Sequence, residues 1–248
     1  MDANIDPSIE KWFKMYRESY EWPPCTGRKE SEQIISKLQS SASSAINENQ
    51  AGKLKTSLTD IYQWKTKNRR TLDYRKTLDS LGEDYLHKII SLGPFNNTEK
   101  LESLINTLHV EYCNLPACSA IASFLFNRQD VPIFDRFLVL FFARKFKDNL
   151  VDEETTQVLR FVKRISFKIG PDGCGKLRPD IYGKNNPGFK VNFDKYIDEF
   201  VPECKRIAEY FHQSNTTYLD IQKKMVEFYP IDVEMAIFSY ATKHNNLF

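Results

Sequence analysis

NLPACSAIASFLFNRQDVPIFDR, residues 114–136, is the stretch of sequence that decides the fold. Its first half, Pro116–Phe126, is small or apolar on almost every side, and a helix of that composition is buried in the middle of a protein. Arg128–Pro132 follows as a loop. Asp135 then stands where it can cap a second, strongly apolar helix over Arg136–Phe146. The stretch therefore predicts a core built from helices.

Apolar residues repeat at helical spacing on both sides of this stretch. Near the start of the chain, Asp6 can cap a helix, Pro7 suits its first turn, and the residues 22–24, Trp-Pro-Pro, end it. Further helices are expected over Glu30–Asn47, Ala51–Thr66, Thr71–Leu92 (one helix or two), Asn97–Leu108, Asp152–Ile169, Phe193–Ser214, Tyr218–Phe228 and Asp232–His244. We expect the second half of Glu30–Asn47 to be polar and exposed.

The long irregular segment is Gly170–Lys190, which holds five of the nine glycines. No segment is predicted as a strand, although Arg164–Ile169 is ambiguous between helix and strand. We predict an all-α protein, a compact multi-helix bundle of about ten helices. Residues 1–248 are expected to form a single unit. The alternative is two helical subdomains, residues 50–150 and residues 1–50 together with 151–248.

The composition agrees with a helical globular protein. Hydrophobic residues make up 41% of the chain and aromatic residues 13%, which is enough for a core and excludes disorder of the whole chain. Nine glycines among 248 residues are few. A β-sandwich or a doubly wound α/β domain needs many tight turns, so the low glycine content argues against both classes.

Several classes of site are not expected. The longest apolar run, Phe137–Ala143, is far shorter than the roughly 20 residues of a membrane helix, and MDANIDPSIEKWF does not resemble a signal peptide. The five cysteines form no C-x-x-C pair, and the four histidines share no ligand spacing with them. We therefore expect an intracellular protein (cytoplasm, nucleoid or nucleus) with buried thiols, no metal site and no cofactor.

Basic residues gather in two segments, although the net charge is only +2. Lys65–Lys76 has six basic residues against one acid, and Arg160–Lys190 has eight against two. Arg160, Arg164 and Lys168 are spaced by four, which places them on one face of the expected helix. Such a stripe can follow DNA phosphates and make binding depend on salt. The alternative is an ordinary solvated helix face.

The segment Gly170–Lys176 satisfies G-x-x-x-x-G-K, the phosphate-binding loop of nucleotide hydrolases. The next residue is Leu177 rather than the Ser or Thr that binds magnesium, and Pro171 removes one backbone N–H from the loop. Pro179 also prevents the helix that this loop should open. We interpret the match as accidental, and a basic, glycine-rich loop beside a DNA groove is the better use for the segment.

The stretch around residues 114–136 resembles the core of the helix-hairpin-helix DNA glycosylase superfamily. In that family a hairpin leads into an alanine-rich helix, and a proline-containing loop then presents an aspartate at the start of the next helix. Upstream, Ile61–Lys65 together with Arg69 and Arg70 resembles a W-K-x-x-R pattern in relatives of this superfamily. The resemblance covers Leu54–Phe146, less than half of the chain.

The resemblance implies base-excision repair of DNA. Asp135 matches the catalytic carboxylate, which stabilises the positively charged sugar as the N-glycosidic bond breaks or activates a water. A helix N-terminus suits this role because it favours a negative charge. The damaged base of a duplex would first be flipped out. Bifunctional members carry a lysine nucleophile early in the buried helix, but Leu115–Cys118 has none, so a monofunctional glycosylase is implied.

Two features keep an alternative open. The family hairpin carries glycines that approach a DNA phosphate, whereas Tyr112–Asn114 has none, and Asp135 can be an ordinary helix cap. The alternative is a non-catalytic helical module that binds nucleic acid or another protein, and a nucleotide hydrolase comes third. Trp64 is a candidate for stacking on a base. The residues expected to contact DNA are Lys65, Lys67, Arg69, Arg70, Asn114, Arg136, Arg160, Arg164, Lys168, Lys176 and Arg178.

Overall fold

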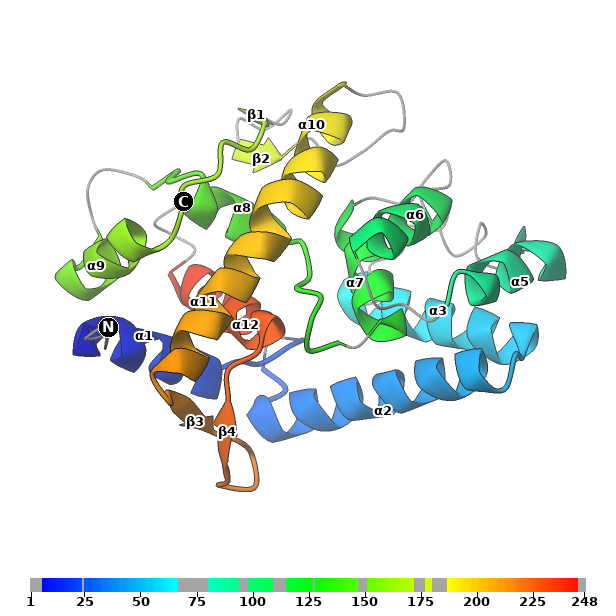
Figure 1. Ribbon diagram of the computed structural model, residues 1–248, viewed down its shortest axis with the longest axis horizontal. Coiled ribbons are helices and arrows are strands. Elements are labelled where there is room, and N and C mark those ends of the chain that lie inside the picture. Colours follow the sequence, from blue (N-terminus) through cyan, green and yellow to red (C-terminus); the bar gives the residue numbers. More distant parts are fainter. Residues whose placement is uncertain are drawn as a thin grey trace.

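The computed structural model describes residues 6–23, 25–66, 80–93, 98–108, 115–126, 128–146, 151–171, 177–179 and 187–244. The protein is mostly helical, as predicted (Figure 1). The helices are α1 (Pro7–Glu18), α2 (Arg28–Asn47), α3 (Ala51–Thr66), α5 (Glu83–Ser91), α6 (Thr98–Leu108), α7 (Leu115–Leu125), α8 (Arg136–Phe142), α9 (Glu153–Phe161), α10 (Pro187–Lys195), the π-helical turn η1 (Tyr196–Phe200), α11 (Val201–Gln213) and α12 (Pro230–Lys243). The strands are β1 (Ile169–Pro171), β2 (Leu177–Pro179), β3 (Thr217–Leu219) and β4 (Met225–Glu227).

Helix α7 lies in the core, as its sequence predicts. It packs against α2, α3 and α6, and almost all of its residues are buried, because small side chains on every face let three neighbours approach. Helix α12 is a second central helix, and it packs against α1, α8 and α11. Figure 1 shows α2, α3, α5, α6 and α7 together on one side of the molecule and α1, α8, α9, α11 and α12 on the other. The division into two subdomains stays a prediction.

Helix α1 begins as the sequence predicts. The Asp6 carboxylate accepts a hydrogen bond from the backbone N–H of Ser8 at 2.9 Å, and Pro7 occupies the first turn. The buried face of the helix includes Trp12 and Phe13. The indole N–H of Trp12 donates to the Thr155 hydroxyl at 3.1 Å, which joins α1 to α9.

The prediction of a helix over Tyr218–Phe228 is wrong, because this segment is an antiparallel hairpin of β3 and β4. The Asp220 carboxylate accepts hydrogen bonds from the backbone N–H groups of Gln222 and Lys224, each at 2.8 Å, and so holds the turn. Tyr218 is buried between more exposed neighbours, which is the alternation of a strand.

The prediction of a helix over Asp152–Ile169 is wrong beyond Phe161. The backbone of Val162 is extended, and in the following segment Ile165 and Phe167 are buried while Arg164, Ser166 and Lys168 are exposed. The segment continues into β1, which pairs with β2 in an antiparallel hairpin. Sequence periodicity failed here because side chains four apart also share one face of a strand.

That correction changes the predicted basic stripe. Arg160 belongs to the last turn of α9, whereas Arg164 and Lys168 lie on the exposed face of the extended segment after it. The three residues therefore do not share a helix face.

Three smaller differences concern two helix boundaries and the exposure of one helix. Helix α8 ends at Phe142 rather than Phe146, and the expected Phe193–Ser214 helix is the end of a longer rod formed by α10, η1 and α11. The second half of α2 is not simply exposed, because Ala42 and Ala45 are buried against the core. Residues 67–79 and 172–176, with most of the first basic segment and the G-x-x-x-x-G-K match, lie outside the described residues.

None of the described helices is both long and apolar enough to cross a membrane. Within the same residues, no group of three His, Cys, Asp or Glu side chains is arranged to hold a metal ion.

Candidate active site

The loop that leads into Asp135 is fixed by buried hydrogen bonds. The carbonyl of Val131 accepts a hydrogen bond from the Ser123 hydroxyl at 2.7 Å. The carbonyl of Pro132 accepts one from the Tyr196 hydroxyl at 2.8 Å. The backbone N–H of Phe134, at the end of the loop, donates to the Ser119 hydroxyl at 2.9 Å. Both serines belong to α7, so the small residues that bury this helix also hold the loop. Asp135 is therefore presented from a rigid support.

Both carboxylate oxygens of Asp135 have partners. Oδ1 accepts from the backbone N–H of Phe137 at 3.0 Å, so Asp135 caps α8 as the sequence predicts. Oδ2 accepts from the ammonium group of Lys65 at 3.0 Å, and 15% of the Asp135 side chain is exposed. Because α8 has only 7 residues, its macrodipole is small, and Lys65 supplies the main positive charge.

Lys65 lies at the end of α3, and its side chain is 9% exposed. Its ammonium nitrogen is 5.5 Å from the ring centroid of Trp22 and 5.9 Å from that of Phe238, distances at which an aromatic ring attracts a cation. The indole N–H of Trp22 donates to the carbonyl of Trp64 at 3.1 Å, which holds the ring against the end of α3. The side chain of Lys65 is thus directed to the carboxylate of Asp135.

Glu234, on α12, is a second carboxylate beside this pair. It is buried, and burial raises its pKa to about 8. Lys65 and Arg128 act in the opposite direction and lower the pKa, whereas the charge of Asp135 raises it further. A backbone hydrogen bond from Ile133 also lowers it. Burial therefore favours the protonated form of Glu234, next to the ion pair of Lys65 and Asp135.

Trp64 is not available to stack on a base in this conformation. Its ring is buried and meets the ring of Phe124 edge to face, with the centroids 5.2 Å apart. The sequence-based suggestion for Trp64 therefore fails: its position on α3 places it in the core.

The second basic segment lies beside the loop that carries Asp135. The ring of Phe167 packs against the ring of Phe134, with the centroids 5.6 Å apart, and Lys168 follows directly in the chain. Lys168 and Arg164 are exposed on this extended segment, and Arg160 is exposed at the end of α9. Among the described residues none of these three side chains forms an ion pair. Of the three, Lys168 follows the residue that contacts the Asp135 loop, whereas Arg160 and Arg164 lie towards the other end of α8, where the backbone N–H of Ile165 donates to the carbonyl of Phe142.

Arg136 directly follows Asp135 and is half-buried, with its guanidinium carbon 4.8 Å from the ring centroid of Phe137.

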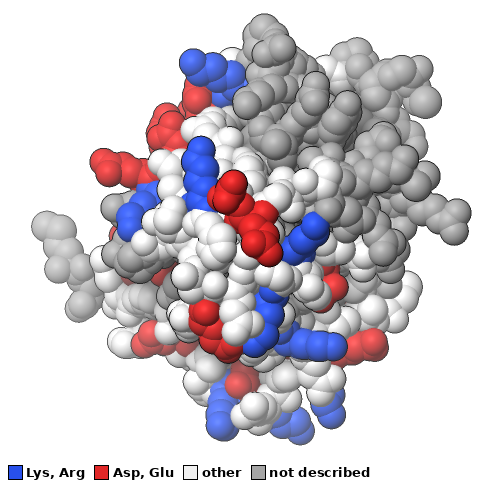
Figure 2. All heavy atoms as spheres, turned by 90° about the vertical axis from the view of Figure 1, so that its right-hand side faces the viewer, with Lys and Arg blue, Asp and Glu red and all other residues white. Residues whose placement is uncertain are grey.

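On the face seen in Figure 2, which is the right-hand side of Figure 1, basic and acidic side chains are interspersed among the described residues. Among the remaining residues expected to contact DNA, Arg178 belongs to β2, and its side chain is not described. Five others lie outside the described residues: Lys67, Arg69, Arg70, Asn114 and Lys176.

Sequence reasoning missed Glu234 and Arg128, which complete the buried charged cluster with Lys65 and Asp135. A signal for Glu234 was present, because its helix, PIDVEMAIFSYATK, is apolar around it. A charged residue inside such a run is rarely buried without a partner. Nothing comparable marked Arg128, which lies in a polar loop sequence.

The arrangement suits proton transfer and the stabilisation of charge. A carboxylate, an ammonium group and a carboxyl group lie together in surroundings from which water is largely excluded, and electrostatic interactions there are stronger than in water. No protein-family model, no curated protein and no solved structure matches this chain.

Proposed function

We propose that this chain is a DNA-binding base-excision repair protein with a fold of the helix-hairpin-helix glycosylase type. Its activity is that of a monofunctional N-glycosylase, with Asp135 as the catalytic carboxylate. One observation carries the proposal: Lys65 and Asp135, which the sequence singles out for separate reasons, form a contact of 3.0 Å.

In the proposed reaction, the bond between C1′ of the sugar and the base nitrogen breaks, and its electron pair leaves with the base. A water oxygen bonds to C1′, and the water loses a proton. The carboxylate of Asp135 stabilises the positive charge that develops on the sugar or accepts that proton. Phe137 fixes Oδ1 and Lys65 fixes Oδ2, so the carboxylate keeps one orientation.

The free cations beside the site support DNA as the partner. Arg160, Arg164 and Lys168 are exposed, and the contact between Phe167 and Phe134 keeps the segment of Lys168 next to the Asp135 loop. Lys168 can hold a phosphate close to a flipped nucleotide, and Arg160 and Arg164, towards the other end of α8, can hold phosphates further along the same strand.

A second function is favoured by a different observation. Both oxygens of Asp135 are already engaged, and only 15% of the side chain is exposed. This arrangement also fits a non-catalytic helical module that binds nucleic acid through the same cations and uses Asp135 only to join α3 to α8.

DNA binding is tested by titrating a duplex across a salt series. The logarithm of the binding constant should fall linearly with the logarithm of the salt concentration, by about 0.9 for each neutralised phosphate. The variant Arg164→Met should reduce the slope by about 1. A binding constant that does not change with salt would refute both DNA-binding functions.

Catalysis is tested by excision assays on duplexes that contain different damaged bases. Asp135→Asn should reduce excision by about 10²–10⁴-fold, as expected for loss of a catalytic carboxylate. Asp152→Asn is a matched control, because Asp152 caps α9 by accepting from the Thr155 N–H at 2.7 Å but lies outside the site. If no damaged base is released while the salt-dependent binding persists, the non-catalytic module is the correct function.

Lys65 is tested by a pair of variants. Lys65→Met should lower excision while leaving DNA binding unchanged, because its ammonium group holds Asp135 rather than a phosphate. Lys65→Arg keeps a cation at the end of α3 and should restore part of the excision rate. Equal loss in both variants would contradict an electrostatic role for Lys65.

A further inference from the structure

Arg128 is a buried cation in the loop between α7 and α8. The residue is 7% exposed, although the next two residues of the loop, Gln129 and Asp130, are exposed. Its guanidinium carbon lies 4.4 Å from the ring centroid of Phe124 and 5.7 Å from that of Trp64. Arg128 is therefore held against two aromatic rings, directly beneath a surface loop.

The donors around Arg128 lack acceptors. Among the described residues, neither Nη1 nor Nη2 of Arg128 has a hydrogen-bond partner, and the same is true of Nε1 of Trp64. All three groups are buried and are donors only. A buried cation without a hydrogen-bond partner destabilises the folded state by several kcal/mol, so binding of an acceptor at this position would be favourable.

Tyr20 and Glu234 act on Arg128 electrostatically, but among the described residues neither forms a hydrogen bond with its Nη1 or Nη2. Burial raises the pKa of Glu234 to about 8, which favours its neutral form and weakens it as a partner for Arg128. Gln39 donates through its amide nitrogen to the carbonyls of Phe124 and Phe126, while its Oε1 finds no donor among the described residues.

We propose that Arg128 and the indole N–H of Trp64 form a binding site for an oxyanion of the phosphate type. A guanidinium group offers two parallel N–H donors to two oxygens of one anion, and the indole N–H adds a third donor. Free inorganic phosphate and a phosphate group of a nucleic-acid strand share this chemistry. The site does not depend on catalysis by Asp135 and goes beyond the proposed function.

The first experiment measures thermal unfolding with and without inorganic phosphate, at equal ionic strength set with sodium chloride. Without phosphate, Arg128→Met should unfold at a higher temperature than the wild-type protein, because it removes a buried cation that lacks a partner. Phosphate should raise the unfolding temperature of the wild-type protein and leave that of Arg128→Met unchanged. Lys224→Met, which removes one exposed positive charge from the β3–β4 hairpin, should respond to phosphate like the wild-type protein.

Arg128→Lys supplies a second variant that keeps the charge but loses the two parallel donors. We expect it to bind phosphate at least tenfold more weakly than the wild-type protein in a titration followed by tryptophan emission, with Trp64 as the nearby reporter. Destabilisation by Arg128→Met in phosphate-free buffer would show that contacts within the protein, including those with Phe124 and Trp64, already compensate the cation, and would overturn the proposal.

The source of the phosphate is distinguished by repeating the emission titration with a short undamaged DNA duplex. A response to DNA alone that Arg128→Met abolishes assigns the site to a strand phosphate, and a response to inorganic phosphate assigns it to the free anion. If neither probe acts through Arg128, the site does not exist. Since undamaged DNA is used, the result is independent of any excision activity.

Discussion

Replacing Asp232 with asparagine is expected to lower the free energy of unfolding by about 3–5 kcal/mol, the usual effect of removing one partner from a buried ion pair. Asp232 is buried at the start of α12. Its Oδ1 accepts from Nε of Arg17 at 2.6 Å and from the Tyr218 hydroxyl at 2.9 Å, and its Oδ2 accepts from the backbone N–H of Tyr229 at 2.9 Å. One carboxylate thus joins α1, the β3–β4 hairpin and α12.

The magnitude follows from what the substitution leaves behind. Arg17 is buried, and without Asp232 its remaining ionic partner is Glu32, at 2.9 Å and with 23% of its side chain exposed. Burial lowers the pKa of Arg17 more than any single partner raises it, but Asp232, Tyr218 and Glu32 together outweigh burial and raise the pKa. Because 1 kcal/mol shifts the midpoint of a protein of this size by about 2–4 °C, the unfolding temperature should fall by about 6–20 °C.

The assay is urea unfolding followed by circular dichroism at 222 nm, with wild type, Asp232→Asn and the double variant Arg17→Met with Asp232→Leu. The double variant removes both charges, so we expect it to be at least about 1 kcal/mol more stable than Asp232→Asn. A loss below about 1 kcal/mol in Asp232→Asn would place this ion pair among ordinary surface pairs and refute the reasoning.

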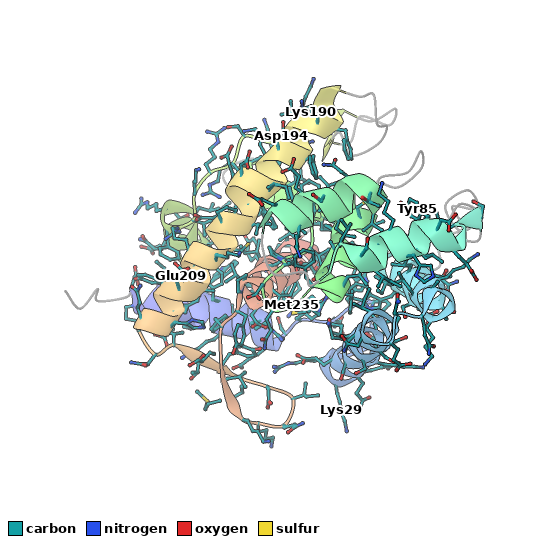
Figure 3. The ribbon with its side chains drawn as sticks, turned by 45° about the vertical axis from the view of Figure 1, so that its right-hand side comes forward. Lys29, Tyr85, Lys190, Asp194, Glu209 and Met235 are labelled. Carbon is teal, nitrogen blue, oxygen red and sulfur yellow. The ribbon has the colours of Figure 1, made fainter. Side chains whose placement is uncertain are left out.

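Three further outcomes are expected. Glu234→Gln should match wild-type stability near pH 5 and exceed it near pH 9, because the folded state raises the pKa of Glu234 to about 8 and wild-type stability therefore falls as the pH rises towards that value. Urea midpoints at the two pH values measure this difference. Glu209→Gln, exposed on α11 (Figure 3), should differ from the wild-type protein by the same amount at both pH values. Ser119→Ala should cost about 1–3 kcal/mol, since the buried N–H of Phe134 loses its acceptor. Tyr196→Phe removes a donor to a loop carbonyl instead and should cost about 0.5–1.5 kcal/mol in the same urea assay.

The helical core could be predicted because its signal is local. In α7, apolar and small residues occupy every face, and only burial on all sides accommodates them. The caps at Asp6, Asp135 and Asp152 are equally local, because a carboxylate reaches an N–H two or three residues ahead. Such features depend on neighbours in the chain, which the sequence displays directly.

The strands were missed because tertiary contacts decide them. In the β3–β4 hairpin, Tyr218 is buried because its hydroxyl reaches Asp232 and its ring packs on Phe228, contacts that cannot be seen in residues 217–227 themselves. After Val162, the extended segment is held by Lys168, whose backbone N–H donates to Asn192 at 2.7 Å. Local periodicity is weaker than such contacts when a segment is short.

The candidate site was predicted in its parts and missed as a whole. Asp135 and Lys65 each carried a local signal, but their pairing spans 70 positions and depends on α3 and the Asp135 loop both packing against α7. Glu234 and Arg128 joined the cluster only through the packing of α12 and the α7–α8 loop. Charged residues in a sequence do not show which of them are buried, because burial is a property of the assembled fold.

The charge balance of this cluster connects the two proposals. Lys65 and Arg128 bring two positive charges, and Asp135 brings one negative charge. Glu234 brings a second negative charge only when it loses the proton that burial helps it keep up to a pKa of about 8. While Glu234 keeps its proton, the cluster has an excess of positive charge, and such an excess in a region of low dielectric favours an anionic partner. Under the two proposals, a strand phosphate at Arg128 would supply that charge and leave the contact between Lys65 and Asp135 in place, so the proposed DNA binding and the proposed catalysis would use different cations.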